Sequence, residues 1–407
     1  MGPILEPNPD LPVTVLDLIQ TSLTLGFRVP WVIGTTLLRR WWPWNRTYKP
    51  PPVREHLFRH VMTCIGNHVP LSVWQWYTAS DTSGSNLKNS TRYGHLPHLF
   101  EPVRTPKFCG YWICCGMSEE AVRPCDADLV VFHAHGGGYA TGHPSVGAPE
   151  HVLLAETLQR HNITTAIFSL DYTLAPRGVF PKQRDEAMAA YDWLCGDIGV
   201  DPSKVVVIGD SAGAHLIISL LVGLFERRGR PVPGENDRDS RPAAAVLVSP
   251  WINLHTSHPR VLDLHWEERL FKRSLDTYCK WMLRDATPEL DVLYGNFALG
   301  REARGSWADI LPARTWITAG SEELVFLYDI EDFVTQAKAD TADVVLDVAT
   351  GKNHAWQCAE AFTQHNRLLA LPLDEQLPSD LMVGYRELAM SILKVIRAEP
   401  SGGRRSF

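Results

Sequence analysis

A serine stands between small residues at the end of an apolar run, in the stretch VVVIGDSAGAHL at residues 205–216. The β-branched residues before it predict a strand and the residues after it predict a helix, so Ser211 lies at a sharp turn. Such a turn holds a serine in a strained backbone conformation with its hydroxyl projecting outward, and Gly209 and Gly213 leave room for tight packing. The chemistry indicated is nucleophilic attack by the Ser211 hydroxyl. A purely structural turn is the alternative, because G-x-S-x-G arises by chance in roughly 0.1 of chains this long.

A weak hydroxyl nucleophile also needs N–H donors for the oxyanion that forms when it attacks a carbonyl carbon. The stretch HAHGGGYATG at 133–142 directly follows a predicted strand and carries His135 before three consecutive glycines. Because glycine has no side chain, such a loop can turn its backbone N–H groups toward a ligand. A flexible glycine turn is the alternative. We expect an oxyanion-stabilising loop, because His-Gly-Gly-Gly should occur by chance in well under about 0.01 of such chains.

The same chemistry needs a general base. In hydrolases of α/β architecture the order along the chain is nucleophile, acid, histidine, so the base should come late. Of the sixteen histidines, those beyond residue 265 are His354 and His365. His354 follows the apolar run DVVLDVA in a predicted loop, whereas His365 lies in a helix-like surface stretch. The sequence predicts His354 as the base and His365 as a structural residue.

A carboxylate should orient the imidazole from the loop after the preceding strand. The stretch RTWITAGSEEL at 314–324 supplies Glu322 and Glu323 at that place. Glu323 lies three residues beyond Gly320, which is the offset expected of the acid. Glu322 remains a competitor, because acidic residues at a helix N-terminus also interact favourably with the helix dipole. Asp329 is a third candidate, further along the chain.

Alternating strands and helices must position these residues, and the sequence shows that alternation from about residue 108 onward. Short β-rich runs between helix-like segments are typical of a mainly parallel sheet wrapped by helices. Polar stretches at 80–94 and 228–242 are predicted to be exposed loops. The predicted strands are 108–116, 128–135, 164–172, 204–210, 243–251, 314–320 and 343–349, and the predicted helices are 150–160, 183–195, 212–228, 322–339 and 378–398.

Several ordered motifs over about residues 125–365 resemble the hormone-sensitive lipase group of α/β-hydrolase esterases. HGGGYATG resembles the oxyanion loop of that group, DYTLAPRGVFP its Y-R-L-A-P-E-x-x-F-P segment, and GDSAGAHL its nucleophile turn. SPWINL at 249–254 and the late NHAW complete the series. The resemblance implies a catalytic triad and an oxyanion hole made by backbone N–H groups. The triad residues are Ser211, Glu323 and His354, and the N–H groups are those of Gly137, Gly138 and Ala212.

The resemblance also implies the α/β-hydrolase fold, with a mainly parallel central sheet flanked by helices and an N-terminal helical cap. Residues 1–105 fit the cap and 106–407 the catalytic domain. Some positions depart from the family pattern. Thr173 and Arg177 replace the usual arginine and glutamate, and His215 stands where asparagine is common.

The region before residue 45 is the other apolar feature of the chain. Residues 11–38 are strongly apolar but contain Asp17, Arg28 and Pro30, so no uncharged run reaches the ~18 residues expected of a spanning helix. A basic aromatic cluster, RRWWPW, follows at 39–44. This combination predicts a segment that lies at a membrane interface or an apolar lid helix, with a true membrane span as the alternative.

Composition narrows the classes of partner. The formal net charge of −7, without a basic stripe and interleaved aromatics, predicts no nucleic-acid partner. The eight cysteines show no paired C-x-x-C spacing, so we expect no metal, and a serine hydrolase needs no cofactor. The chain opens without the basic region of a signal peptide, which favours a cytoplasmic or membrane-associated, ER-type location over secretion. The oligomeric state stays open.

We therefore predict a serine carboxylic-ester hydrolase that acts on a small-molecule ester. An apolar pocket favours an uncharged ligand, because desolvating a charge there is costly. The expected substrate is a neutral ester with a short, acetyl-type acyl group on a bulky hydrophobic alcohol. Acyl transfer, or a non-hydrolytic biosynthetic reaction in secondary metabolism, is the alternative on the same scaffold. A catalytically silent ligand-binding protein is a third hypothesis.

Overall fold

One eight-stranded sheet forms the centre of the computed structural model, which describes residues 11–41, 53–79, 83–228, 241–263 and 266–397. The strand order is β1-β2-β4-β3-β5-β6-β7-β8. β2 pairs antiparallel with β1 and β4, and every further pair of neighbours is parallel. The strands are β1 Glu101–Arg104, β2 Cys109–Cys115, β3 Leu129–Ala134, β4 Thr165–Asp171, β5 Val205–Asp210, β6 Ala244–Val248, β7 Thr315–Gly320 and β8 Val344–Ala349.

The central strands are apolar throughout because both of their faces are covered. Along β5, Val205 and Val207 belong to the core on one face of the sheet, whereas Val206 and Ile208 belong to the core on the other. Successive side chains of a strand point to opposite faces, so a continuous apolar run fits a strand buried on both sides. This burial fixes the register of the strands that carry the predicted site.

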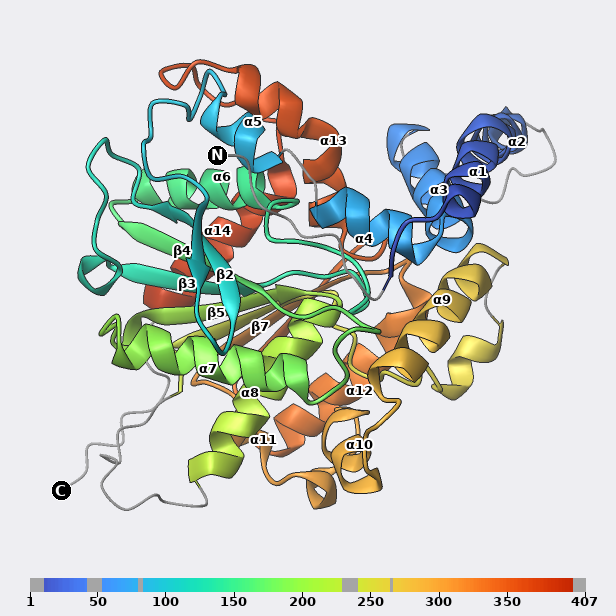
Figure 1. Cartoon of the computed structure of the whole chain (residues 1–407). Helices are drawn as coiled ribbons and strands as arrows, with labels where there is room; N and C mark the ends of the chain where they lie inside the picture. Colours follow the sequence, from blue (N-terminus) through green and yellow to red (C-terminus); the bar gives the residue numbers. More distant parts are fainter. Residues whose placement is uncertain (1–10, 42–52, 80–82, 229–240, 264–265, 398–407) are drawn as a thin grey trace.

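Two groups of helices cover the two faces of the sheet (Figure 1). The first group is α5 Ser83–Lys88, α6 Ala148–Gln159, α13 Trp356–Ala370 and α14 Val383–Arg397. The second group is α7 Lys182–Gly196, α8 Ala212–Arg228, α11 Trp307–Ile310 and α12 Leu324–Ala339. A further helix, α10, runs over Pro288–Tyr294, and short 3-10 turns are η2 Pro124–Asp126, η3 Pro202–Lys204, η4 Pro259–Asp263 and η5 Arg301–Ala303.

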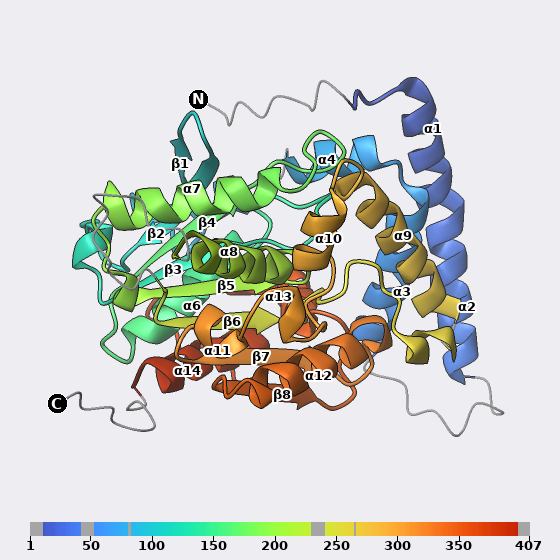
Figure 2. The same cartoon turned by 90° about the horizontal axis from the view of Figure 1, so that it is seen from below.

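A third group of helices lies beyond the end of the sheet, and both views show it on one side of the molecule (Figures 1 and 2). It combines the N-terminal helices with α9, which comes from between β6 and β7. α3 contacts both α2 and α9, so segments far apart in sequence form one layer. The members are α1 Val15–Leu23, the π-helical η1 Thr24–Arg28, α2 Val29–Trp41, α3 Val53–His68, α4 Leu71–Ala79 and α9 Trp266–Met282.

The fold predicted from the sequence is confirmed. The seven predicted strands correspond to β2 through β8, and the five predicted helices to α6, α7, α8, α12 and α14. β1 was not predicted, because its four residues contain a proline and are mostly exposed. The division into residues 1–105 and 106–407 stays a prediction.

The prediction of an exposed loop over 80–94 is wrong for the part that the structure describes. Residues 83–88 form α5, and Arg92 and Tyr93 are fully buried. The Arg92 guanidinium donates two hydrogen bonds to Glu156, of 2.6 and 2.9 Å, and the Tyr93 hydroxyl donates a third of 2.7 Å. Burial disfavours the charged carboxylate, but these hydrogen bonds outweigh it and hold the pKa of Glu156 below its usual value. A buried partner in α6 therefore overrides the polar composition of the stretch. Most of the other predicted loop, 228–242, lies outside the described residues.

No helix in the described part of the chain is both long and apolar enough to cross a membrane. Residues 42–44 of the basic aromatic cluster lie outside the described residues. The apolar segment before them forms α1, η1 and α2.

Candidate active site

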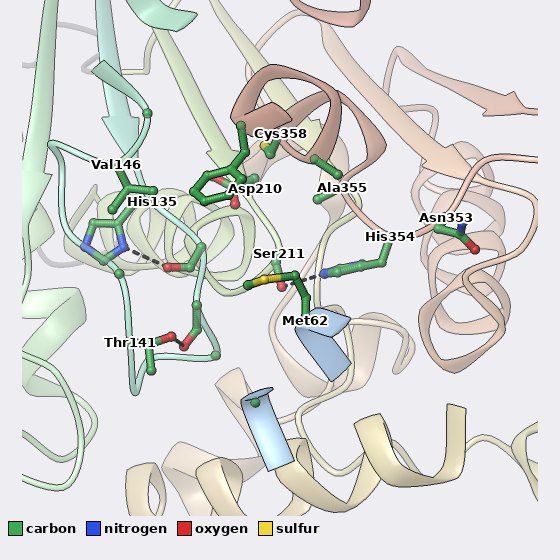
Figure 3. Close-up of a pocket in the computed structure, with 18 of the residues that line it drawn as sticks. Met62, His135, Thr141, Val146, Asp210, Ser211, Asn353, His354, Ala355 and Cys358 are labelled. Carbon is green, nitrogen blue, oxygen red and sulfur yellow. Dashed lines mark hydrogen bonds between the residues drawn. The ribbon is translucent and has the colours of Figure 1, made fainter. Parts of the chain in front are cut away.

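Ser211 lies at the turn between β5 and α8, where the sequence places it. Its φ is +53°, a left-handed conformation that costs energy for any residue with a side chain. The turn is crowded, because a Cβ on Gly213 would lie 2.0 Å from the carbonyl oxygen of Ala134, and one on Gly209 would lie 2.4 Å from the Gly213 carbonyl carbon. Both glycines are therefore required by the close approach of the chain to itself. The strained turn directs the Ser211 side chain toward His354 (Figure 3).

His354, in the loop after β8, links the serine to a carboxylate. Its Nε2 lies 2.9 Å from Ser211 Oγ, and its Nδ1 lies 2.7 Å from Glu323 Oε2. Because an ionised carboxylate can only accept, Nδ1 carries the proton and donates it, which leaves Nε2 to accept from the serine hydroxyl. The Phe326 ring stacks on the imidazole at 4.3 Å between ring centroids and limits its rotation. The imidazole is thus held in the orientation and tautomer that a general base needs.

Glu323, at the start of α12, is the carboxylate that reaches the histidine. It is 2% exposed, and its second oxygen, Oε1, accepts hydrogen bonds from the Gly320 N–H and from the Ser249 hydroxyl at 2.9 Å. Glu322 instead accepts a hydrogen bond from Ser321 at 3.1 Å. Asp329 accepts one from the Asn253 amide at 3.1 Å. Of the three acids considered from the sequence, the structure brings Glu323 to His354.

Ser249 is a site residue that sequence reasoning did not single out. It follows β6, and its hydroxyl donates to Glu323 while accepting a hydrogen bond from the Ala355 N–H at 2.9 Å. One side chain therefore joins the acid to the residue next to His354. The available signal was its place in the SPWINL motif, directly after a predicted strand. Ser249 positions the acid and the base relative to each other.

The glycine loop after β3 packs against the serine turn. Gly137 and Gly138 have φ values of +112° and +62°, which favour glycine. No described residue accepts a hydrogen bond from the N–H of Gly137 or Gly138. Ala212 is the first residue of α8, and the N–H groups of a first helical turn have no partner within their helix. Three N–H groups near Ser211 are therefore available to a ligand.

Two aromatic residues, Tyr172 and Tyr278, pack against the glycine loop. The Tyr172 hydroxyl donates to the His135 carbonyl at 2.7 Å, and the two rings stack with centroids 4.3 Å apart. Tyr278 of α9 also packs against the loop, because a Cβ on Gly138 would lie 2.6 Å from its ring. A helix of the outer layer therefore touches the predicted oxyanion loop directly.

Two of the residues that depart from the family pattern, His215 and Thr173, form hydrogen bonds with nearby residues. His215 is fully buried between the Tyr139 hydroxyl at 2.7 Å and the Tyr294 carbonyl at 2.8 Å. Burial lowers its pKa to about 3, so the ring is neutral. The backbone N–H of Thr173 donates to Glu186 at 2.7 Å. Arg177 is exposed. His365 lies within α13 and does not line the cavity.

The triad opens into a cavity of about 480 Å³ between the sheet and the outer helices. Figure 3 shows Met62 of α3 projecting toward the part of the cavity that contains Ser211 and His354. His133 and His151 line its inner end, and burial lowers the pKa of each to about 3, so both are neutral. The apolar part of the lining comes mainly from the outer helices and from α12 and α13: Phe58, Met62, Trp74, Phe271, Leu275, Tyr278, Phe326 and Phe362.

Charged side chains also line this cavity, which the sequence did not indicate. They include Glu55, Arg59 and Glu150. Glu55 is 3.4 Å from the Lys352 ammonium, so its charge has a partner within the protein. Among the described residues no group of three or more histidine, cysteine or acidic side chains is arranged to hold a metal ion. The expectation that no metal or cofactor is needed stays a prediction.

Comparisons with known proteins agree with this geometry. Residues 131–358 match the model of the alpha/beta hydrolase fold family, and the chain belongs to that family. An acetyl-hydrolase of Streptomyces hygroscopicus is 36% identical over 33% of this chain and 40% of its own length. The esterase LipU of Mycobacterium tuberculosis is 27% identical over 72% of this chain and 90% of its own. A hormone-sensitive lipase from a metagenome library has a similar fold, with a TM-score of 0.58 at 19% identity, over 84% of this chain and 98% of its own.

The resemblance to the hormone-sensitive lipase group is thereby confirmed, and so is the α/β-hydrolase fold. The predicted enzyme class, a serine hydrolase of the carboxylesterase type, is supported by the same relatives. A family match does not assign the roles of individual residues or the identity of the substrate.

Proposed function

We propose that this protein is a serine carboxylesterase that cleaves neutral esters with a short, acetyl-type acyl group on a bulky hydrophobic alcohol. The observation that carries the proposal is the continuous chain from Ser211 Oγ through His354 to the buried Glu323, which opens into a largely apolar cavity. The acetyl-hydrolase relative supports the acyl half of the proposal.

In this mechanism Ser211 Oγ attacks the ester carbonyl carbon while His354 Nε2 takes the hydroxyl proton. The N–H groups of Gly137, Gly138 and Ala212 donate to the oxyanion of the tetrahedral intermediate. When the intermediate collapses, the imidazolium gives its proton to the leaving alcohol and an acyl-serine remains. A water molecule, deprotonated by the same imidazole, then attacks the acyl-serine and releases the acid. Glu323 stabilises the imidazolium in both halves of the cycle.

The lining favours uncharged substrates. The rings of Phe58, Trp74 and Phe271 can cover an apolar alcohol group, and burial of apolar surface stabilises by ~25 cal/mol per Å². A free charge on the substrate would lose its hydration against the rings of Phe58 and Phe271, which offer it no hydrogen bond. This argument supports the neutral-ester half of the proposal.

A series of p-nitrophenyl esters with C2, C4, C8 and C16 acyl chains tests the acyl preference. We expect the largest kcat/KM at C2 or C4 and a value at least about tenfold lower at C16. Ser211→Ala is the matched control and should lose about 10⁴-fold or more in kcat, because residual catalysis then comes from binding and the oxyanion donors alone. A maximum at C16, or a jump in rate at a lipid–water interface, would identify a lipase instead.

The two alternatives have separate outcomes in the same assay. Transfer of the acyl group to an added alcohol in preference to water would identify an acyltransferase. No turnover of any ester, together with no labelling of Ser211 by a fluorophosphonate, would identify a silent binding protein. Wild-type turnover by Ser211→Ala would reject the mechanism as a whole.

A further inference from the structure

The N-terminal helix, defined here as residues 15–41, forms the outermost element on its side of the molecule. α1, η1 and α2 follow one another without a break, because the junction residues Thr24 and Val29 keep right-handed helical backbone angles. At ~1.5 Å per residue these elements span about 40 Å. Figure 2 shows them as one long helix along the edge of the structure, outside α3 and α9.

Most of the large apolar side chains of the N-terminal helix are exposed. Trp41 is 83% exposed, and Trp31 and Phe27 are each 73% exposed. The buried side chains described on this helix are Thr24 and Thr36. The large apolar side chains that are at least half exposed are Val15, Leu16, Leu18, Ile19, Leu23, Leu25, Phe27, Trp31, Leu38 and Trp41.

The inward side of the N-terminal helix is joined to α3 and α4 by hydrogen bonds and also carries half-buried apolar side chains, among them Val32 and Ile33. Asp17 accepts from the Ser72 hydroxyl at 3.1 Å, and the Gln20 amide donates to the His68 carbonyl at 2.9 Å. Further along, the Thr36 hydroxyl lies 2.8 Å from His60 Nδ1. These contacts set the rotation of the helix about its axis, so its apolar side cannot turn inward without breaking them. Unlike an ordinary surface helix in water, this helix therefore exposes most of its large apolar side chains.

We propose that the outward face of the N-terminal helix binds the lipid–water interface of a membrane that contains anionic lipid. A face of this size is unusual on a protein surrounded by water alone, and burial in acyl chains removes it from water. Between residues 15 and 41 the acidic residue is Asp17, which is bonded inward, whereas Arg28, Arg39 and Arg40 are basic. Tryptophan next to basic residues is typical of a segment at headgroup depth.

The shape of the face favours lipid over a second copy of the chain or another protein. Leu16 and Leu18 are both at least half exposed, although two residues along a helix point about 160° apart. The apolar side chains thus cover a wide arc of a rod that projects from the body. A protein partner would need a deep groove to cover such a ridge, whereas fluid acyl chains adapt to it. The helix then lies in the plane of the interface, because no described helix can span the bilayer.

Vesicle flotation of the full chain tests this proposal. Vesicles of phosphatidylcholine alone are compared with vesicles containing about a third phosphatidylserine. We expect the wild-type protein to float with both and to bind the anionic vesicles more tightly, with the difference removed by high salt. The triple variant L23Q/F27Q/W31Q should bind at least about tenfold more weakly, because three exposed apolar side chains leave the interface.

The matched control is V292Q/L299Q/L373Q, which replaces three exposed apolar side chains outside the N-terminal helix. We expect this control to float like the wild type, and both variants to keep the wild-type kcat on a soluble ester, which shows that they fold. Wild-type protein that stays in the buffer fraction would overturn the proposal. So would equal binding by L23Q/F27Q/W31Q, or a wild-type dimer that does not float and that this variant converts to a monomer.

Discussion

Polar and apolar side chains are distributed in opposite ways in the sheet-borne body and in the N-terminal helix. In the body the strands β3 and β5 bury their apolar side chains. Polar groups in the interior are hydrogen-bonded, as Glu323 is to Ser249 and His354. In the N-terminal helix Thr24 and Thr36 are buried, whereas most of the large apolar side chains, Trp31 and Trp41 among them, are exposed. The two regions are thus built for different surroundings.

This contrast shows what an apolar run in a sequence can and cannot predict. In the body an apolar residue marks the interior because water is the surrounding phase. In the N-terminal helix the same residue types mark the surface that we assign to lipid. Hydrogen bonds to α3 and α4, together with half-buried side chains such as Val32 and Ile33, attach that helix to the protein. The following predictions test how far each half of the contrast holds, beginning with the largest expected effect.

Glu323→Gln should lower kcat by about 10³ to 10⁴-fold, because an amide keeps the shape of the side chain but cannot stabilise the imidazolium. Steady-state kinetics on p-nitrophenyl acetate measures the loss. Glu322→Gln is the matched control and should retain activity within about threefold, since Glu322 bonds Ser321 and not the histidine. The reverse ranking of the two variants would assign the acid to Glu322 and contradict the geometry.

Arg92→Met should destabilise the body by about 3–5 kcal/mol, because it removes the main partner of a buried carboxylate. Urea unfolding measures the free energy of unfolding. Tyr93→Phe removes one of the hydrogen bonds to Glu156 and should cost about 1 kcal/mol. A loss below about 1 kcal/mol for Arg92→Met would show that removing a buried ion-pair partner costs no more here than it does on an exposed surface.

The two predictions differ in how far the sequence led to them. Ser211, Glu323 and His354 each follow a strand of the parallel sheet, whose carboxyl ends meet at one edge. Order and spacing therefore predicted the serine and the histidine, whereas the choice of Glu323 over Glu322 and Asp329 needed the contact with His354. Arg92 and Glu156 are far apart in sequence and lie on a short turn and a helix. The polar composition around Arg92 predicts a loop, and only the three-dimensional contact with α6 shows that it is buried. The role of Ser249 likewise depends on a contact, not on a spacing.

The outward orientation of the apolar face of the N-terminal helix could not be predicted from the sequence, for a related reason. Helical spacing indicates that apolar residues share a side of a helix, but it does not state which way that side turns. The rotation is set by contacts such as Asp17 with Ser72 and Thr36 with His60, whose partners lie in α3 and α4. The sequence therefore could not decide between a lid, an interfacial helix and a membrane span.

Asp329 provides a pH test of the body. Burial raises its pKa to about 6 from the ordinary 3.8. Because the folded-state pKa is the higher one, the stability that this group contributes is present below about pH 4 and is lost as the pH rises through 6. The loss amounts to roughly 3 kcal/mol at most, from about two pKa units. Asp329→Asn keeps an acceptor for Asn253 and should remove this part of the decline between pH 4 and 7.

Urea unfolding of wild type and Asp329→Asn across that pH range measures the difference, which should grow in favour of the variant as the pH rises. Activity at pH 7.5 should stay within about threefold of wild type, because Asp329 does not contact His354. A difference that does not change with pH would show that folding leaves the pKa of Asp329 unshifted.

Thr14→Ala should have the smallest effect, and it tests the other side of the contrast. The Thr14 hydroxyl accepts from the Asp17 N–H at 3.1 Å while the Asp17 carboxylate accepts from the Thr14 N–H at 2.8 Å, a reciprocal cap at the start of α1. Its loss should weaken the first turn by about 1 kcal/mol and speed amide exchange there about fivefold, without changing kcat. In the body a lost polar contact leaves a buried group unsatisfied, whereas here water replaces it. If the outward face binds lipid, anionic vesicles should restore slow amide exchange to α1 in the variant. Binding to the membrane would then stabilise the helix in place of the lost cap. If exchange stays fast on vesicles, the first turn of α1 does not belong to the face that binds lipid.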